Sequence, residues 1–158
     1  MRTNRGGLME EDVLGIEVKK TSRAIKGYVN KVVGSFLEKY NVNVSGTEGM
    51  ILSYVFRHDE RIVSAKLLMQ EFGVSKATMS QSLSTLYKKG LITYEEWNED
   101  GRVKRILLTE TATALENDIE KALLEVDTFL KGAYTEEELN SLHTLLRKLR
   151  ERIGTLDL

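Results

Sequence analysis

The side chains with the clearest chemical potential lie on one face of a helix predicted over residues 76–89. That stretch holds no acidic residue. The candidates on or beside this face are small or polar: Ser75, Lys76, Ala77, Thr78, Ser80, Gln81, Ser84 and Thr85. Glutamine can pair bidentately with adenine, and an alanine methyl can meet the thymine methyl. The pattern therefore predicts contact with DNA bases, with the amides of the first turn offered to a phosphate. The alternative is an ordinary solvated face.

Basic side chains follow a predicted hairpin turn at Asn98-Glu-Asp-Gly101. Arg102 comes directly after the turn and Lys104 two residues later. We expect Arg102 to reach a minor groove or a phosphate, because it lies nearest the tip. The alternative is a surface ion pair between Asp100 and Arg102, worth at most about 1 kcal/mol. Both can hold, since the carboxylate can orient the guanidinium.

Two short helices joined by a tight turn are expected to position the polar face of residues 76–89. Ser64 and Ser75 are the expected N-caps, because a serine hydroxyl accepts a hydrogen bond from a free amide. Gly73 and Gly90 are the expected stops. The inward apolar stripes recur at helical spacing: Leu67, Leu68, Phe72, Met79, Leu83 and Leu86.

After Gly90 the pattern becomes strand-like over residues 91–94 and again over residues 103–108. We expect these two strands to form a hairpin, with residues 61–63 adding a short third strand. The order helix, turn, helix, strand, turn, strand is that of a winged helix-turn-helix. Nothing else in the chain offers a competing chemistry.

Long helices are predicted on both sides of this segment. The first runs from about residue 10 to residue 39, and a capping box at Ser45-Gly-Thr-Glu48 opens the next. Downstream, apolar residues recur from Leu115 to Leu130, and a second capping box begins at Thr135. The chain contains no proline, which suits uninterrupted helices.

The predicted fold is mainly α with a small antiparallel β wing. We expect an N-terminal dimerisation helix in residues 1–44, the winged helix-turn-helix in 45–109 and C-terminal dimerisation helices in 110–158, all within one compact domain. The terminal helices carry more apolar surface than one protomer needs to hide. A homodimer with interleaved helices accounts for this surface, and an intramolecular bundle is the alternative.

Three motifs in order resemble the MarR family of transcriptional regulators. They are Leu86-Tyr-Lys-Lys-Gly-Leu-Ile92, Asp100-Gly-Arg102 and Leu107-Leu-Thr109. The resemblance implies that Asp100 orients Arg102 and that Arg102 enters the minor groove. This sequence departs from the family pattern at Tyr87, where an acid is common, and after Thr109, where a glycine is frequent.

The same resemblance implies a small-molecule effector that binds where dimerisation helices meet the winged domain and alters DNA affinity. The candidates for that ligand pocket are Tyr28, Phe36 and Tyr54, with Tyr40 and Phe56 as further ones. The alternative for each is ordinary core packing. The sequence does not identify the effector.

Composition excludes several classes of function. The chain has no cysteine, so thiol redox sensing and thiolate metal sites are ruled out. The two histidines, His58 and His143, lie far apart and are expected on the surface, so we expect no metal and no cofactor. No phosphate loop or nucleophile motif favours an enzyme. We expect a cytoplasmic protein, because no apolar run could span a membrane or serve as a signal peptide.

Charge is distributed unevenly along the chain. Residues 1–56 and 57–109 each carry a net charge of +2, and residues 110–158 carry −5. Locally basic surface is sufficient for phosphate binding despite the total of −1. The sequence predicts a homodimeric regulator that binds double-stranded DNA at a pseudo-palindromic operator, as a ligand-responsive repressor. The alternative is a winged-helix protein–protein interaction module without DNA binding.

Overall fold

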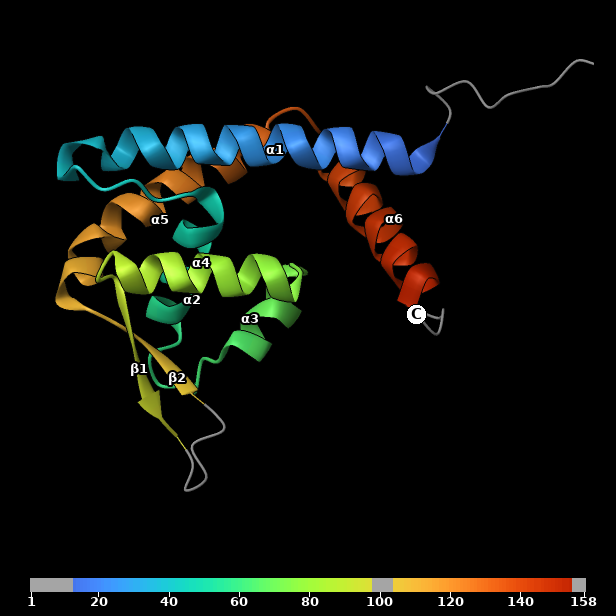
Figure 1. Cartoon of the computed structure of the whole chain (residues 1–158). Coiled ribbons are helices and arrows are strands. Elements are labelled where there is room, and N and C mark those ends of the chain that lie inside the picture. The colour runs from blue at the N-terminus through green and yellow to red at the C-terminus, as the bar shows by residue number, and fades with distance from the viewer. Residues whose placement is uncertain (1–12, 98–103, 155–158) are drawn as a thin grey trace, which may run out of the picture. The chain divides into compact units, whose positions relative to one another are not determined.

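The computed structural model describes residues 13–97 and 104–154, and helices dominate both ranges (Figure 1). In chain order the elements are α1 (Leu14–Leu37), the 3-10 helix η2 (Glu38–Tyr40), α2 (Gly46–Arg57), α3 (Ala65–Phe72), α4 (Lys76–Lys88), β1 (Ile92–Glu96), β2 (Lys104–Leu108), α5 (Glu110–Lys131) and α6 (Glu136–Gly154). The predicted fold class, helical with a small antiparallel wing and long terminal helices, is confirmed.

The chain packs as two compact units, Met1–Leu123 and Leu124–Leu158. The N-terminal unit holds α1 to α4, the sheet and the larger part of α5, and the C-terminal unit holds the rest of α5 and α6. The division of the chain at residues 44 and 109 stays a prediction about function.

Local capping chemistry sets the limits of the two short helices. Ser64 accepts a hydrogen bond from the amide of Leu67 at 3.3 Å, and Ser75 accepts one from Thr78 at 3.2 Å. Gly73 ends α3 with φ at +61°, and Gly90 follows α4 with φ at +67°. Residues with a side chain rarely adopt such angles, which explains why glycine stands at both stops. All four predicted helix limits are confirmed.

The wing is a two-stranded antiparallel sheet in which Ile92 pairs with Leu108 and Glu96 with Lys104. The predicted third strand at residues 61–63 is wrong for the described chain. Among the described residues, one backbone hydrogen bond joins that segment to the sheet, from the amide of Ile106 to the carbonyl of Val63 at 2.8 Å. Val63 is buried, so its apolar side chain belongs to the core without forming a ladder.

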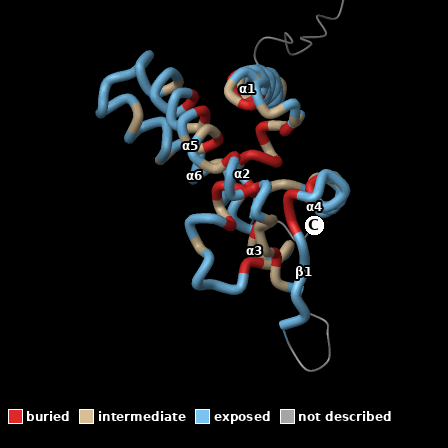
Figure 2. Tube along the Cα trace, turned by 90° about the vertical axis from the view of Figure 1, so that its left-hand side faces the viewer, coloured by how far each residue is buried: buried red, intermediate tan, exposed pale blue. Residues whose placement is uncertain are grey.

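The core of the N-terminal unit collects side chains from every α-helix in it and from the sheet. Its largest fully buried members include Leu37, Ile51, Leu68, Met79, Leu86, Leu91, Ile106, Leu115 and Ile119. Figure 2 shows these buried segments along the inward sides of the elements. The predicted first helix, residues 10–39, is shorter as an α-helix, because a 3-10 turn and left-handed Asn41 end it. Residues 10–12 lie outside the described residues.

The C-terminal unit has little core of its own. Thr135 and Glu138 form the predicted capping box, with amide-to-side-chain distances of 2.8 and 3.2 Å. No residue of α6 is buried. Over the described ranges, no helix is both long and apolar enough to cross a membrane.

Candidate nucleic-acid interface

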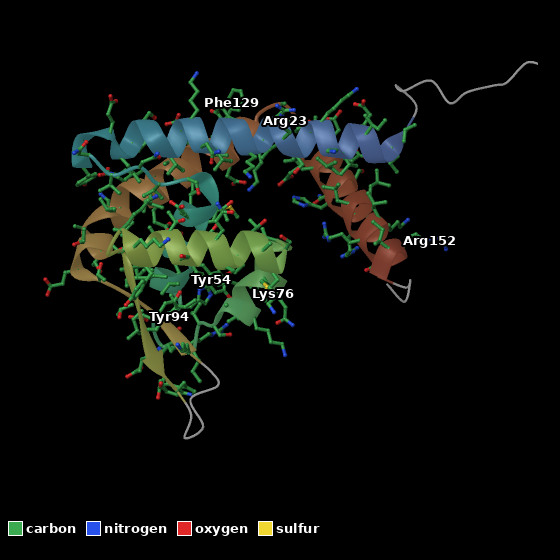
Figure 3. All side chains as sticks on the ribbon, in the orientation of Figure 1. Arg23, Tyr54, Lys76, Tyr94, Phe129 and Arg152 are labelled. Atoms are coloured by element: carbon green, nitrogen blue, oxygen red, sulfur yellow. The ribbon has the colours of Figure 1, made fainter. Side chains whose placement is uncertain are left out.

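The structure gathers the predicted base-contacting residues on the exposed side of α4. Lys76, Ala77, Ser80, Gln81 and Ser84 are exposed, and Thr85 is half-buried beside them. These six residues are called the reading face below, and Figure 3 labels Lys76 at its start. The opposite side of α4 is the buried stripe of Met79, Leu83 and Leu86. This amphipathic pattern fixes which way the polar side chains point.

The threonines of α4 are more constrained than their neighbours. The Thr85 hydroxyl donates to the Gln81 carbonyl at 2.9 Å, and Thr78 accepts from the Ser75 hydroxyl at 3.0 Å. Both hydroxyls are therefore engaged locally. Gln81 and the serines at positions 80 and 84 remain exposed with polar side chains that can reach a ligand.

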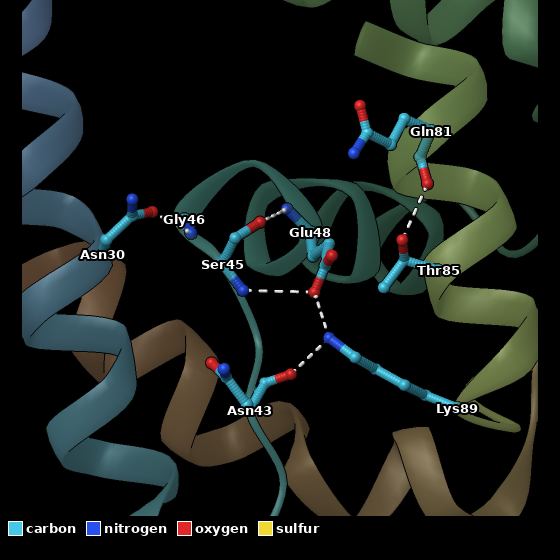
Figure 4. A network of polar contacts seen from close by, with 8 residues as sticks. All are labelled: Asn30, Asn43, Ser45, Gly46, Glu48, Gln81, Thr85 and Lys89. Atoms are coloured by element: carbon cyan, nitrogen blue, oxygen red, sulfur yellow. Dashed lines mark hydrogen bonds and ion pairs between the residues drawn. The ribbon is translucent and has the colours of Figure 1, made fainter.

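A buried carboxylate anchors the end of α4. Lys89 follows the helix, and its ammonium lies 2.8 Å from Oε2 of Glu48, which is only 6% exposed (Figure 4). The same ammonium donates to the carbonyl of Asn43, and the Glu48 carboxylate also accepts from the amide of Ser45 at 3.1 Å. A buried charge is tolerated only with such partners. Lys89 therefore holds the C-terminal end of α4 against the start of α2.

This anchor continues into α1. The amide of Gly46 donates to Oδ1 of Asn30 at 2.7 Å. A Cβ at Gly46 would lie 2.4 Å from Cγ1 of Val29, so only glycine permits the two helices to approach this closely. The α4 helix, which carries the reading face, is thus linked to α1 through the start of α2. The sequence indicated the capping box at Ser45 and Glu48 but not the second role of Glu48, because Lys89 is far away in sequence.

Two further polar clusters join α5 to the helices before it. The Tyr40 hydroxyl donates to Asp118 at 2.6 Å, and the Lys39 ammonium lies 2.8 Å from the same carboxylate. The bond from Lys39, then that from Tyr40, holds the pKa of Asp118 below its usual value. In the second cluster, the Ser53 hydroxyl donates to Glu120, and Arg57 lies 3.4 Å from that carboxylate.

Two of the predicted wing residues, Asp100 and Arg102, lie outside the described residues. Lys104 begins β2 and is exposed. Arg105 is a structural residue of the wing, which sequence reasoning did not separate from its neighbours. Its guanidinium donates to the Asp59 carbonyl, lies 3.8 Å from Glu95 and sits 5.5 Å from the ring centre of Trp97.

The structure places the candidate ligand-pocket residues on two different helices. Tyr28 and Phe36 are half-buried on α1. The Tyr54 ring on α2 stacks on His58 at 4.2 Å and meets Phe72 edge-on at 5.6 Å, so these contacts lie toward α3. The pocket assignment stays a prediction. Among residues 13–97 and 104–154, no group of three or more potential metal ligands comes together.

A family model matches the region that carries this geometry. Residues 42–103 match the model of the MarR family. This winged-helix segment is similar to the MarR family. The predicted resemblance is therefore confirmed for the segment that holds α2, α3, α4 and β1.

Solved structures of MarR-family regulators share the fold beyond this segment. The transcription regulator MarR from Oenococcus oeni is 24% identical with a TM-score of 0.69, and the match covers 88% of this chain and 99% of that one. MepR of S. aureus, solved with DNA, is 20% identical with a TM-score of 0.74, covering 92% and 99%. PcaV of Streptomyces coelicolor, solved with its natural ligand, is 13% identical with a TM-score of 0.71, covering 92% and 97%. At these levels of sequence identity, the similarity between this chain and the solved structures concerns the fold alone.

Proposed function

We propose that this chain is a homodimeric transcriptional regulator that binds double-stranded DNA sequence-specifically through the reading face of α4. The observation that carries the proposal is the composition of that face. It exposes Lys76, Gln81 and small hydroxyl side chains, with no acidic residue over residues 76–89. The MarR-family fold and the DNA complex of MepR support the same function.

The homodimer is supported by apolar surface that one chain leaves uncovered. Leu142, Leu146 and Ile153 recur along α6 and are 39–50% exposed. A two-fold dimer presents two copies of α4 to a pseudo-palindromic operator, with half-sites about one helical turn apart. Each half-site would then meet one reading face and one wing.

The reading face is proposed to enter the major groove, where base pairs are distinguishable. Arg102 is proposed to enter the adjacent minor groove, oriented by Asp100, and Lys104 to contact a phosphate. The cytoplasm is the proposed compartment. We further propose that the regulator is a repressor whose DNA affinity changes with a small-molecule effector, a role supported by the ligand complex of PcaV.

The first test is a titration of the purified protein into labelled duplexes at several salt concentrations. One duplex carries random sequence, and the others tile the region upstream of the protein's own gene. The proposal expects tight binding to one segment, with two protomers per site and steep weakening by salt. Equally weak binding to every duplex would instead favour a protein-interaction role for the winged helix.

Gln81→Ala tests base readout. It should reduce the preference for the operator over random duplex, because Gln81 is proposed to contact a base edge. A preference loss of about tenfold corresponds to about 1.4 kcal/mol, within the roughly 1–3 kcal/mol of discrimination that one bidentate contact supplies. The matched control is Gln70→Ala on α3, which removes an exposed glutamine outside the reading face. Equal losses on both duplexes would contradict readout by Gln81.

Arg102→Ala tests the wing. It should weaken operator binding and leave the dimer and its helicity intact, because Arg102 is proposed to act on DNA alone. Arg147→Ala on α6 is the control for loss of one arginine. Unchanged affinity for the operator would remove the wing from the mechanism.

A further inference from the structure

A surface groove borders the reading face on the side of the wing. It lies between α3, α4 and β1 and has a volume of about 460 Å³. Lys76, Ser80 and Ser84 belong both to its lining and to the reading face. The groove therefore continues the surface that is proposed to meet DNA.

The chemistry of the groove matches a sugar–phosphate strand. Its floor is apolar, with Met69, Met79 and Leu83 among the lining residues, and its rim carries hydroxyls and the Lys76 ammonium. No residue that lines it is acidic. A deoxyribose offers an apolar surface and a phosphate offers anionic acceptor oxygens, so both parts of the backbone find a suitable surface here.

Two tyrosines form the end of the groove. Tyr87 comes from the last turn of α4 and Tyr94 from β1, and their rings stack with centres 5.6 Å apart. Tyr87 is 56% exposed and Tyr94 is 37% exposed. Figure 3 labels Tyr94 on the wing. Stacking restrains both rings, so their hydroxyls are presented with little conformational freedom left to lose.

A tyrosine hydroxyl can donate a hydrogen bond to a phosphate oxygen. Burial, followed by the nearby Tyr87, raises the pKa of Tyr94 above its usual value, so its hydroxyl keeps its proton. Carboxylates farther along β1 have basic neighbours. Glu95 lies 3.8 Å from Arg105, and Glu96 pairs with Lys104 in the sheet.

We propose that the groove holds one sugar–phosphate strand of the bound duplex and that Tyr87 and Tyr94 donate hydrogen bonds to its phosphates. The inference rests on the proposed DNA binding by the reading face. An α-helix, about 10–12 Å across, fills a major groove about 12 Å wide, so the backbone must pass beside it. The α4–β1 side is where the strand leads from the reading helix to the wing.

Tyr87→Phe, Tyr94→Phe and the double variant test these contacts in the full chain. The double variant should bind the operator and random duplex about tenfold more weakly, because hydrogen bonds to charged groups are lost and phosphates carry no sequence information. Tyr134→Phe is the control, since Tyr134 is half exposed in the C-terminal unit. Circular dichroism should show unchanged helicity in all four proteins.

A methylphosphonate scan identifies the phosphate. Neutralising the contacted phosphates together should weaken binding by the parent protein and abolish the difference between the parent and the double variant. Parent-like affinity of the double variant, while Gln81→Ala still reduces base preference, would overturn this inference and leave the proposed function intact. A loss confined to the operator would also overturn it. A parent that binds no duplex would overturn both.

The competing occupant is a small aromatic molecule. Isothermal titration with phenol as the probe distinguishes the two. Phenol binding that is lost in the double variant and does not compete with DNA would make the groove a small-molecule site and overturn the backbone contact. Absence of such binding, together with the tenfold loss on DNA, supports it.

Discussion

The helices α4 and α6 divide apolar and polar surface in opposite ways. The 13-residue α4 buries Met79, Leu83 and Leu86, and its exposed side is small and polar. The 19-residue α6 buries no residue, and Leu142, Leu145, Leu146 and Ile153 are 39–61% exposed. Both helices have an apolar stripe, and that of α4 is buried in the core of the N-terminal unit.

This difference matches the two roles that are proposed for these helices. Full burial of a leucine side chain stabilises by about 1.5–3 kcal/mol, so α6 leaves several such contributions unrealised. The packed stripe of α4 fixes its exposed face in one orientation, as recognition of a base sequence requires. The exposed stripe of α6 is the surface that is proposed to self-associate.

Leu142→Asp with Leu146→Asp should break the dimer. Two carboxylates in an apolar interface would lose their hydration, so association should be lost at micromolar concentration. Sedimentation velocity should report a particle of 18.0 kDa in place of twice that mass. Asn140→Asp is the control, because it adds a carboxylate on the opposite side of α6 and should leave the dimer intact. A double variant that remains dimeric would contradict the role of α6.

Lys89→Met should destabilise the N-terminal unit by about 2 kcal/mol, because it leaves the Glu48 carboxylate buried without its cation. Urea unfolding measures the change. Lys88→Met is the matched control, since Lys88 is an exposed neighbour, and it should alter stability by less than about 0.5 kcal/mol. Dimerisation should be unaffected by either change. Equal effects of the two variants would show that the anchor contributes nothing.

Ser75→Ala should lower stability by about 1 kcal/mol through loss of the α4 N-cap. Ser75→Asp separates capping from DNA binding at the same position. Aspartate can cap the helix, so stability should return to that of the parent. Its charge would face phosphate, so DNA affinity should fall below that of Ser75→Ala. Equal affinities of the two variants would place Ser75 away from the DNA.

Asp118 should give a small pH dependence to the stability of the N-terminal unit. Its folded pKa is lowered by Lys39 and Tyr40, so its contribution is present above its usual pKa of 3.8 and is lost as pH falls through the folded value. In Asp118→Asn the free energy of unfolding should fall less steeply below pH 3.8. Acid-unfolding curves that run parallel in parent and variant would contradict this.

Sequence patterns were sufficient where the structure depends on neighbours along the chain. The caps at Ser45, Ser64, Ser75 and Thr135 are local hydrogen bonds, and the buried stripe of α4 follows from helical spacing. These features positioned the reading face correctly. Its contact with DNA remains a proposal.

Contacts between distant segments could not be predicted in this way. The Lys89–Glu48 pair joins residues 41 apart, and the Tyr40–Asp118 bond joins residues 78 apart. Nothing in the local pattern around either residue indicates its partner. The prediction of a third strand was wrong for a related reason. Ile62 and Val63 are β-branched, as strand residues often are, but only Val63 reaches the sheet.

The start of α2 has a consequence for hydrogen exchange. The first amides of a helix usually face water. Here the amides of Ser45, Gly46, Glu48 and Gly49 all donate to protein oxygens, one of them on α1. Because the acceptor of the Gly46 amide is on α1, deuterium should enter at Gly46 only when α1 and α2 separate. The amides of Ser45, Glu48 and Gly49 bond within the start of α2 and should also exchange when that turn alone opens. The difference between Gly46 and the other three is a native-state probe of the separation of the two helices, measured with the protein still folded.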